Sequence, residues 1–336
     1  MTDRPRLTPA IADVRRAVRD AFEHAGIVSG DFVLVACSGG PDSLALAAAV
    51  AFEAPRAGIS AGAVIVEHGI QAVTKEVAAQ TAVVLGELGL EPVQIAHVQV
   101  GADGGPEAAA RTARYAALDE AAAALDAKAV LLGHTLDDQA ETVLLGLARG
   151  SGPRALNGMA VHSGRYLRPL LGVKRATTHA FCEDFGLEPW IDPQNSEDRF
   201  SRVRVRQAVL PMLEIELGPG IAESLARTAE LIREDNDYLD ELALAAYETA
   251  ITAGPTSLGL NIEALQTLAV PVRNRVILRA LTVFGETYGR VHVLAVADLI
   301  DNWHGQKELA LPGVRVVRTG SQITLKTTKT LKSGAC

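Results

Sequence analysis

Four short apolar segments, separated by alanine-rich stretches, limit the folds that this chain can adopt. Each segment is rich in Val, Ile or Leu, and each stretch between them is long enough to contain a helix. Strands that alternate with helices predict βαβ units with right-handed crossovers. We therefore predict an α/β fold with a parallel, Rossmann-like sheet and helices on both faces. The four segments are FVLVAC at 32–37, AVIVEH at 63–68, VQIAHV at 93–98 and AVLLGH at 129–134.

Three of the predicted strands end at, or just before, a residue that can bind a ligand. These residues are Ser38, His68 and His134. Ligands of parallel α/β sheets bind beyond the carboxyl ends of the strands. We therefore expect a ligand site at this edge, with His68 as a nucleotide contact. The alternative for His68 is a structural histidine whose neighbours satisfy its ring nitrogens.

A segment rich in Ser and Gly, SGGPDS at 38–43, joins the first predicted strand to the next helix. Its backbone N–H groups and hydroxyls can converge on an anion at the helix N-terminus. The chain has no GxxxxGK[ST] sequence, so the lysine of a Walker loop is missing. Asp42 then suits a phosphate site only if Mg²⁺ lies between its carboxylate and the phosphate oxygens. The alternative is a plain turn in which Ser38 or Ser43 caps the helix.

A second cluster, HTLDDQAET at 134–142, places acids at the start of another predicted helix. Asp138 and Glu141 are three positions apart, so their carboxylates share one side of the helix, and His134 lies just before them. This group can hold Mg²⁺ or an ammonium group. The alternative is structural, because acids near a helix N-terminus stabilise its dipole and Thr135 with Asp138 resembles a capping pair.

The length of 336 residues predicts two domains. Residues 153–193 contain several Gly and Pro residues and look irregular, and a helix then runs toward Pro211. After a Gly-Pro-Gly break at 218–220, apolar residues at near-heptad spacing predict a long helix over 221–252. A helix over 272–284 and a strand-rich tail, GVRVVRTGSQITLK, follow. We expect a catalytic domain at 1–213, a smaller and mainly helical domain at 214–326, and a disordered tail at 327–336.

The net charge of −8 is unfavourable for binding nucleic acid, because contacts from Lys and Arg to phosphate dominate such affinity. The Lys and Arg residues are, however, concentrated in two places. Residues 304–336 contain six Lys and Arg residues against one acid, and four arginines lie at 199–206. The spacing of these arginines does not decide between a helix and an extended segment. Both groups are either nucleic-acid contacts or ordinary solvated surfaces.

The start of the chain mixes acids with arginines and has no long apolar block, which argues against a signal peptide. The longest apolar run, 44–52, is shorter than the about 20 residues that cross a bilayer. Cys37, Cys182 and Cys336 form no CxxC pair, which argues against a disulfide framework, a zinc ribbon and an iron–sulfur site. We therefore expect a cytoplasmic protein with no membrane partner.

Both clusters resemble known motifs. SGGPDS resembles the PP-loop of the N-type ATP pyrophosphatases, which cleave ATP between the α- and β-phosphates. HTLDDQAET, followed by RGSG at 149–152 and NGM at 157–159, looks like the motif set of the tRNA(Ile)-lysidine synthetases. Further matches are VEHG at 66–69, ARTARY at 110–115, DPQN at 192–195 and FSRVRVRQAVLP at 200–211.

The resemblance implies an enzyme that uses ATP and Mg²⁺ to adenylate the C2 oxygen of the cytidine at the first anticodon position of tRNA(Ile) with a CAU anticodon. Free L-lysine then displaces AMP to give lysidine, so the protein would be a ligase that forms carbon–nitrogen bonds. Alternatives are a PP-loop tRNA thiolase, for which paired cysteines are expected, and another adenylating, amide-forming ligase. A non-catalytic nucleotide-sensing module is a third alternative, and a homodimer is left open.

The resemblance also implies roles for individual residues. Arg111 is expected near the nucleotide, although it could instead pair with Glu107, four positions earlier. The expected catalytic residues are Asp42, which also holds the metal, His134, Asp138 and Glu141. The expected ATP contacts are Ser38, Gly39, Gly40, Pro41, Asp42, Ser43, His68, Arg111 and Gly133. The expected tRNA contacts are Arg114, Arg199, Arg202, Arg204, Arg206, Lys326 and Lys329.

Overall fold

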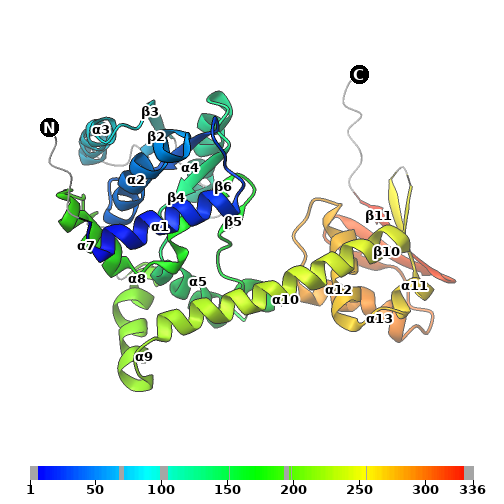
Figure 1. Ribbon diagram of the computed structural model, residues 1–336. Coiled ribbons are helices and arrows are strands. Elements are labelled where there is room, and N and C mark those ends of the chain that lie inside the picture. The colour runs from blue at the N-terminus through cyan, green and yellow to red at the C-terminus, as the bar shows by residue number, and fades with distance from the viewer. Residues whose placement is uncertain are drawn as a thin grey trace. The chain divides into compact units, whose positions relative to one another are not determined.

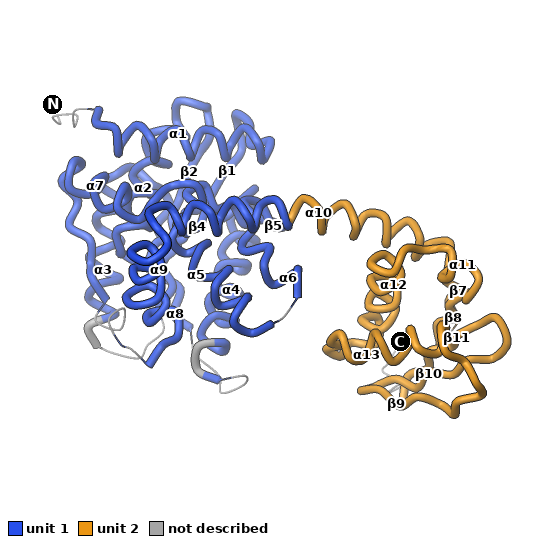
Figure 2. The backbone as a smooth tube through the Cα atoms, turned by 90° about the horizontal axis from the view of Figure 1, so that it is seen from below, with its two compact units in different colours: residues 1–232 blue, residues 233–336 orange. Residues whose placement is uncertain are grey.

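The chain forms two compact units, residues 1–232 and 233–336 (Figure 2). A 30-residue helix, α10 (Ile221–Ala250), begins in the first unit and ends in the second, which confirms the long helix predicted over 221–252. The expected domain boundary after residue 213 lies shortly before this helix. The computed structural model describes residues 7–67, 72–98, 105–150, 152–192, 197, 199–254 and 256–328 (Figure 1).

The first unit is built on a six-stranded sheet with the order β3-β2-β1-β4-β6-β5. Neighbouring strands are parallel except for β5, which runs antiparallel to β6. All four predicted strands are present, and the predicted parallel α/β fold is confirmed. The strands are β1 (Phe32–Ala36), β2 (Ser60–Glu67), β3 (Val93–His97), β4 (Ala129–Leu132), β5 (His162–Ser163) and β6 (Tyr166–Leu167).

Helices cover both faces of this sheet because alternate strand residues point to opposite sides. Val33 and Val35 of β1 are buried in a core with α1, α2, α3 and α7, whereas Leu34 and Ala36 are buried in a second core with α4. The helices of the layers are α1 (Pro9–His24), α2 (Pro41–Glu53), α3 (Ala72–Glu87), α4 (Pro106–Ala124) and α5 (Leu136–Ala148), with a short η1 (Pro55–Ala57) after α2.

The segment at 153–193 is more regular than expected. Its 11-residue helix α7 (Arg175–Phe185) buries Phe181 and Cys182 in the main core and ends at Gly186, which has a left-handed backbone. The prediction of an irregular segment was therefore wrong here, because packing of this apolar face stabilises a helix that weak local signals did not mark. The segment also contains α6 (Pro153–Leu156), the β5–β6 hairpin and η2 (Pro169–Gly172).

A continuous helical segment runs from Ser201 to Leu217, so the helix predicted toward Pro211 is confirmed and extends beyond it. It consists of α8 (Ser201–Arg204), a π-helical turn labelled η4 (Val205–Val209) and α9 (Leu210–Leu217). Pro211 has no N–H to donate, and the wider turn lies directly before it. The arginines at 202–206 are therefore helical.

The second unit combines helices with a five-stranded antiparallel sheet of order β7-β8-β11-β10-β9. The helix predicted at 272–284 is α12 (Val270–Thr282), and the predicted strand-rich tail forms β10 (Val314–Thr319) and β11 (Gln322–Thr327). Residues 329–336 lie outside the described part of the chain. The remaining elements, which were not predicted individually, are β7 (Ile251–Ala253), β8 (Ser257–Asn261), α11 (Ile262–Gln266), α13 (Arg290–Asp301) and β9 (Leu309–Leu311). Among the described helices, none combines the length and the apolar character that a membrane crossing requires.

Candidate active site

The SGGPDS loop joins β1 to α2, and the buried hydroxyl of Ser43 stabilises it through hydrogen bonds to its backbone. Ser43 Oγ donates to Gly40 O at 3.0 Å and accepts from Ser38 N at 3.1 Å. Trp190 N also donates to Gly39 O at 2.9 Å. The N-cap of α2 is Gly40 rather than either serine. The first-turn N–H groups of a helix have no partner within it, so this end of α2 can bind an anion.

Two glycines allow close backbone approach at the loop. Gly39 has φ of +82°, and a Cβ atom there would lie 2.6 Å from Thr81 Oγ1. A Cβ atom at Gly133, directly after β4, would lie 3.0 Å from the backbone oxygen of Asp42. The end of β4 therefore packs against the start of α2. The absence of a side chain at Gly133 permits this close packing, and the contact of Gly133 with ATP stays a prediction.

Asp42, in the first turn of α2, has two partners on α7. Thr178 Oγ1 donates a short hydrogen bond to Asp42 Oδ1, and Arg175 Nε lies 3.6 Å from Oδ2. Burial raises the pKa of Asp42, although the Thr178 hydrogen bond and the Arg175 charge act in the opposite direction. The side chain is still 22% exposed, so it can meet an external ligand.

Asp138 uses its two oxygens for different contacts. Oδ2 accepts from Thr135 N at 2.9 Å and from Thr135 Oγ1 at 3.0 Å, so Asp138 does cap α5. Oδ1 accepts from Arg175 Nη2 at 2.9 Å. Burial raises the pKa of Asp138, but the Arg175 charge and the Thr135 hydrogen bond outweigh burial, and the net pKa is below its usual value. The carboxylate is therefore charged near neutral pH.

Glu141 is fully buried on α5 and faces three arginines. Arg206 Nε lies 2.7 Å and Arg175 Nη1 3.2 Å from its Oε1, and Arg202 Nε lies 3.6 Å from its Oε2. Arg206 Nη2 is also 3.5 Å from Asp138 Oδ1. Arg202 and Arg206, predicted as tRNA contacts, thus pair with the predicted catalytic acids Asp138 and Glu141.

Arg175 and Thr178 were not among the residues predicted from sequence. Both lie at the start of α7, in the segment that was expected to be irregular. The available signal was the spacing of Phe181, Cys182 and Phe185, which places apolar side chains on one face of a helix.

His134 lies two positions after β4 and interacts with the charge of Asp138. Burial lowers the pKa of His134 to about 4, although the Asp138 carboxylate acts in the opposite direction. The imidazole is therefore neutral near pH 7. Its Nδ1 atom is buried and has no hydrogen-bond partner among the described residues, so it can meet a polar group of a substrate.

The two predicted arginines of α4 have different surroundings. Arg111 is exposed, and its Nη2 donates to the Tyr115 hydroxyl at 3.3 Å. The side chain of Glu107, its alternative partner, lies outside the described residues. Burial lowers the pKa of Arg114, and the thiol of Cys37 is among the groups that interact with its charge. Arg114 therefore lies near the end of β1, where the loop begins.

The other predicted contacts are dispersed. Arg204 is exposed and its Nη1 donates to Arg199 O at 3.1 Å, while Arg199 Nε pairs with Glu197 at 2.5 Å. Lys326 is exposed on β11 of the second unit. His68 and Lys329 lie outside the described residues, so their predicted contacts with ATP and tRNA are not tested.

The acids also allow a test of the expected magnesium ion. Within the described ranges, no group of three or more His, Cys, Asp or Glu side chains is arranged to hold a metal. Mg²⁺, however, is commonly bound through one or two carboxylates together with waters and substrate phosphates. Asp42, partly exposed at the anion-binding end of α2, fits this mode of binding.

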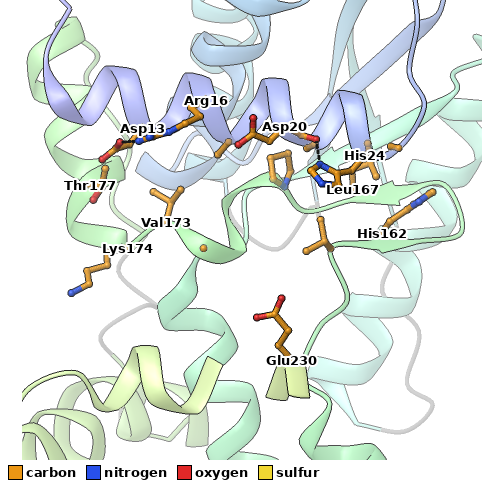
Figure 3. A pocket seen from close by; sticks show the side chains of 16 residues that line it. Asp13, Arg16, Asp20, His24, His162, Leu167, Val173, Lys174, Thr177 and Glu230 are labelled. Atoms are coloured by element: carbon orange, nitrogen blue, oxygen red, sulfur yellow. Dashed lines mark hydrogen bonds and ion pairs between the residues drawn. The ribbon is translucent and has the colours of Figure 1, made fainter. Parts of the chain in front are cut away.

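A separate hollow of about 790 Å³ lies beside α7 (Figure 3). Lys174 and Thr177 line it, whereas their neighbours Arg175 and Thr178 contact the acids, because successive residues of a helix point about 100° apart. The predicted site residues are not part of its wall. Other residues around it include Asp13, Arg16, His24, His162 and Glu230.

Two family models and several known proteins match this chain. A family model described as a PP-loop domain matches residues 12–213, and one described as the TilS substrate binding domain matches residues 260–323. A tRNA(Ile)-lysidine synthase of Leifsonia xyli subsp. xyli is 56% identical over 300 residues, which cover 89% of this chain and 90% of that protein. A tRNA(Ile)-lysidine synthase of Thermobifida fusca is 51% identical over 310 residues, covering 91% of this chain and 94% of that protein.

Among solved structures, the U34-tRNA thiolase NcsA from Methanococcus maripaludis, with its 4Fe-4S cluster, is similar with a TM-score of 0.57. It shares 21% sequence identity and covers 67% of this chain and 80% of its own, so the likeness concerns the fold alone. The matches at about half identity extend over nearly the whole chain. With its PP-loop, its two family models and these relatives, the chain belongs to the tRNA(Ile)-lysidine synthase family.

Proposed function

We propose that this chain joins L-lysine to the cytidine at the first anticodon position of tRNA(Ile) with a CAU anticodon, with ATP as the activating substrate. As a member of its family, it is a ligase that forms carbon–nitrogen bonds. The observation that carries the proposal is the meeting of Asp42, Asp138 and Glu141 around Arg175. This arrangement puts an anion-binding loop beside an acid pair that can bind a cation, and the reaction needs both.

The SGGPDS loop is proposed to hold the phosphates of ATP. The N-terminus of α2 favours negative charge, and Gly39 lets the backbone come close. Asp42 would hold Mg²⁺, which when bound offsets the negative charge that develops on pyrophosphate. Arg111 and Arg114 supply guanidinium groups suited to phosphates and to the edge of the incoming base.

Asp138 and Glu141 are proposed to bind the ε-ammonium group of lysine. Attraction for a cation is stronger at such buried acids than in bulk water. The side chain of Asp138 is 12% exposed, so it can meet the ammonium group directly, whereas Glu141 has no exposed surface and faces three arginines, so it adds negative charge behind Asp138. Only the neutral amine attacks, and reaching it at pH 7 from a pKa near 10.4 costs roughly 4 to 5 kcal/mol. His134, neutral at this pH, can accept a hydrogen bond from the amine, but its low pKa makes it a weak base. The acids are therefore assigned to binding the cation.

The tRNA is proposed to contact exposed Arg and Lys side chains in each unit. Arg199 and Arg204 are exposed in the first unit, and in the second unit Arg315 and Lys326 are exposed register partners on β10 and β11. The target base must leave the anticodon stack to enter the site. A cytoplasmic location, where tRNA is processed, and a homodimer remain predictions.

A PP-loop tRNA thiolase is the main alternative reaction. Burial raises the pKa of the Cys37 thiol, and burial raises that of Cys182 to about 12, so both thiols stay protonated at neutral pH. The synthase relatives are about half identical to this chain, whereas the thiolase likeness is limited to the fold. A metabolic amide-forming ligase would not require tRNA.

The test is incubation of the purified protein with ATP, Mg²⁺, labelled lysine and tRNA(Ile) carrying a CAU anticodon. We expect label in the tRNA together with AMP and pyrophosphate, and none with a tRNA whose first anticodon base is uridine. Pyrophosphate release without transfer of lysine to the tRNA would contradict the proposed function. Transfer of sulfur from an added donor would instead support the thiolase.

A further inference from the structure

Arg175 is the one described residue that contacts all three proposed catalytic acids. Its Nε lies 3.6 Å from Asp42 Oδ2, its Nη2 2.9 Å from Asp138 Oδ1 and its Nη1 3.2 Å from Glu141 Oε1. Its backbone N–H also donates to Asp137 Oδ2 at 2.8 Å. Each guanidinium nitrogen is therefore assigned to a different carboxylate, and two of these carboxylates lie on α5 while the third lies on α2.

Thr178, one turn further along α7, contacts only one of these three acids. Its hydroxyl is fully buried and donates to Asp42 Oδ1. The same oxygen lies 2.7 Å from Arg175 O, which ties it to the start of the helix. Thr178 therefore orients Asp42 without touching the acid pair of α5.

Helix α7 is firmly anchored, so it can serve as a support for these contacts. Phe181 and Cys182 are buried in the main core together with residues of α1 and α2. Cys182 Sγ donates to Pro41 O, in the loop itself, at 3.4 Å. The side chain of Arg175 is only 18% exposed, so its fork has little freedom to leave the acids.

We propose that Arg175 is a positioning residue that holds Asp42 of the loop and the Asp138–Glu141 pair of α5 at a fixed separation, so that both halves of the reaction act on the same cytidine. The assignment rests on the proposed function, in which Asp42 serves the ATP step and the acid pair serves the lysine step. Like charges repel when brought together in a poorly solvated site, and a planar guanidinium can bridge several carboxylates at once. A point charge such as an ammonium cannot reproduce that geometry.

The role is tested with four single variants. Arg175→Gln removes the charge and the fork, Arg175→Lys keeps the charge alone, and Thr178→Val removes only the hydroxyl that faces Asp42. The matched control is Lys174→Gln, because Lys174 precedes Arg175 but is exposed and pairs with Glu223 at the surface. For each variant we would measure the melting temperature, kcat, the KM for lysine and the Mg²⁺ concentration that gives half-maximal activity.

A misplacement of about 1 Å can cost on the order of 100-fold in rate, so we expect Arg175→Lys to fold like the parent with kcat lower by roughly that factor. We expect Arg175→Gln to raise both the lysine KM and the Mg²⁺ requirement. Thr178→Val should raise the Mg²⁺ requirement and leave the lysine KM unchanged, and Lys174→Gln should match the parent in every measurement.

Parental kcat and KM in Arg175→Lys would overturn the positioning role, whatever the stability of Arg175→Gln. A rise in the lysine KM of Thr178→Val as large as that of Arg175→Gln would overturn the proposed division between the two steps. The proposed function is tested on the unsubstituted protein, which must transfer lysine to tRNA before any variant is compared. Failure of the inference is therefore distinct from failure of the function.

Discussion

The Nε atom of Arg206 lies 2.7 Å from Oε1 of Glu141, a carboxylate with no exposed surface. The arginine lies in the π-helical turn η4. Such turns interrupt regular helices and are frequent at functional sites. A buried charge that loses a partner is costly, so this pair links the order of the site to the stability of the fold.

Replacing Arg206 with Met should destabilise the protein by about 1 to 3 kcal/mol, because Glu141 then keeps fewer cationic partners. The cost is below that of breaking an isolated buried pair because Arg175 and Arg202 remain near the carboxylate. Urea unfolding measures the change, with Arg204→Met as the control, since Arg204 is exposed on the same helix. Equal losses in the two variants would contradict the buried network.

Asp42→Asn should leave the melting temperature within a few degrees of the parent and abolish tRNA-dependent pyrophosphate release. Burial already raises the pKa of Asp42, so a neutral amide is tolerated there, whereas an amide binds Mg²⁺ far less well than a carboxylate. The measurement is pyrophosphate release at millimolar Mg²⁺, and full activity of the variant would remove the metal assignment.

Asp138→Asn should lower stability and turnover by different amounts. The Asn carbonyl oxygen can still accept from Thr135, so the weakened capping contacts should cost no more than about 0.5 to 2 kcal/mol, whereas loss of the charge that binds the lysine cation should reduce lysidine formation by roughly 100-fold or more. Thermal melts and labelled-lysine incorporation, measured on the same samples, separate the two effects. A large thermal loss with normal turnover would assign Asp138 to capping alone.

Stability should decrease as the pH falls from about 6.5 to about 4 because of His134. Its pKa is about 4 in the folded chain against an ordinary value of 6.5, so the unfolded chain binds more protons within that window. The contribution is complete above pH 6.5 and amounts to at most about 1.4 kcal/mol per pH unit. Urea unfolding at pH 7 and pH 5 should therefore show a smaller difference for His134→Gln than for the parent. An unchanged difference would mean that folding does not lower the pKa of His134.

Replacing Lys326, Lys329 and Lys332 with Gln should weaken tRNA binding in a salt-dependent manner and leave ATP affinity unchanged. Each phosphate contact that is lost should flatten the slope of log K against log salt by about 0.7 to 0.9. Lys326 is exposed on β11, whereas the other two lysines lie outside the described residues. A variant with the parental slope would show that these three lysines do not contact tRNA and would leave tRNA binding to the first unit.

Features confined to one element could be predicted from the sequence. The Val- and Ile-rich runs became β1 to β4, because strands buried on both faces need nearly continuous apolar residues. The capping role of Asp138 and its position one turn before Glu141 follow from helical spacing alone. The acids and the loop were located for the same reason, since each motif lies at the end of one strand.

Contacts between distant segments were decided by the tertiary structure. Thr178 and Asp42 are 136 positions apart, and no local pattern marked α7 as their meeting place. The four arginines at 199–206 show most clearly what the sequence alone could not decide. Their spacing left open whether the segment is helical or extended, and both roles considered for this block placed the arginines at the surface. Packing of η4 against α5 turned Arg206 toward Glu141 and left Arg204 exposed, and that choice depends on which helix face is buried rather than on the residues of the block itself.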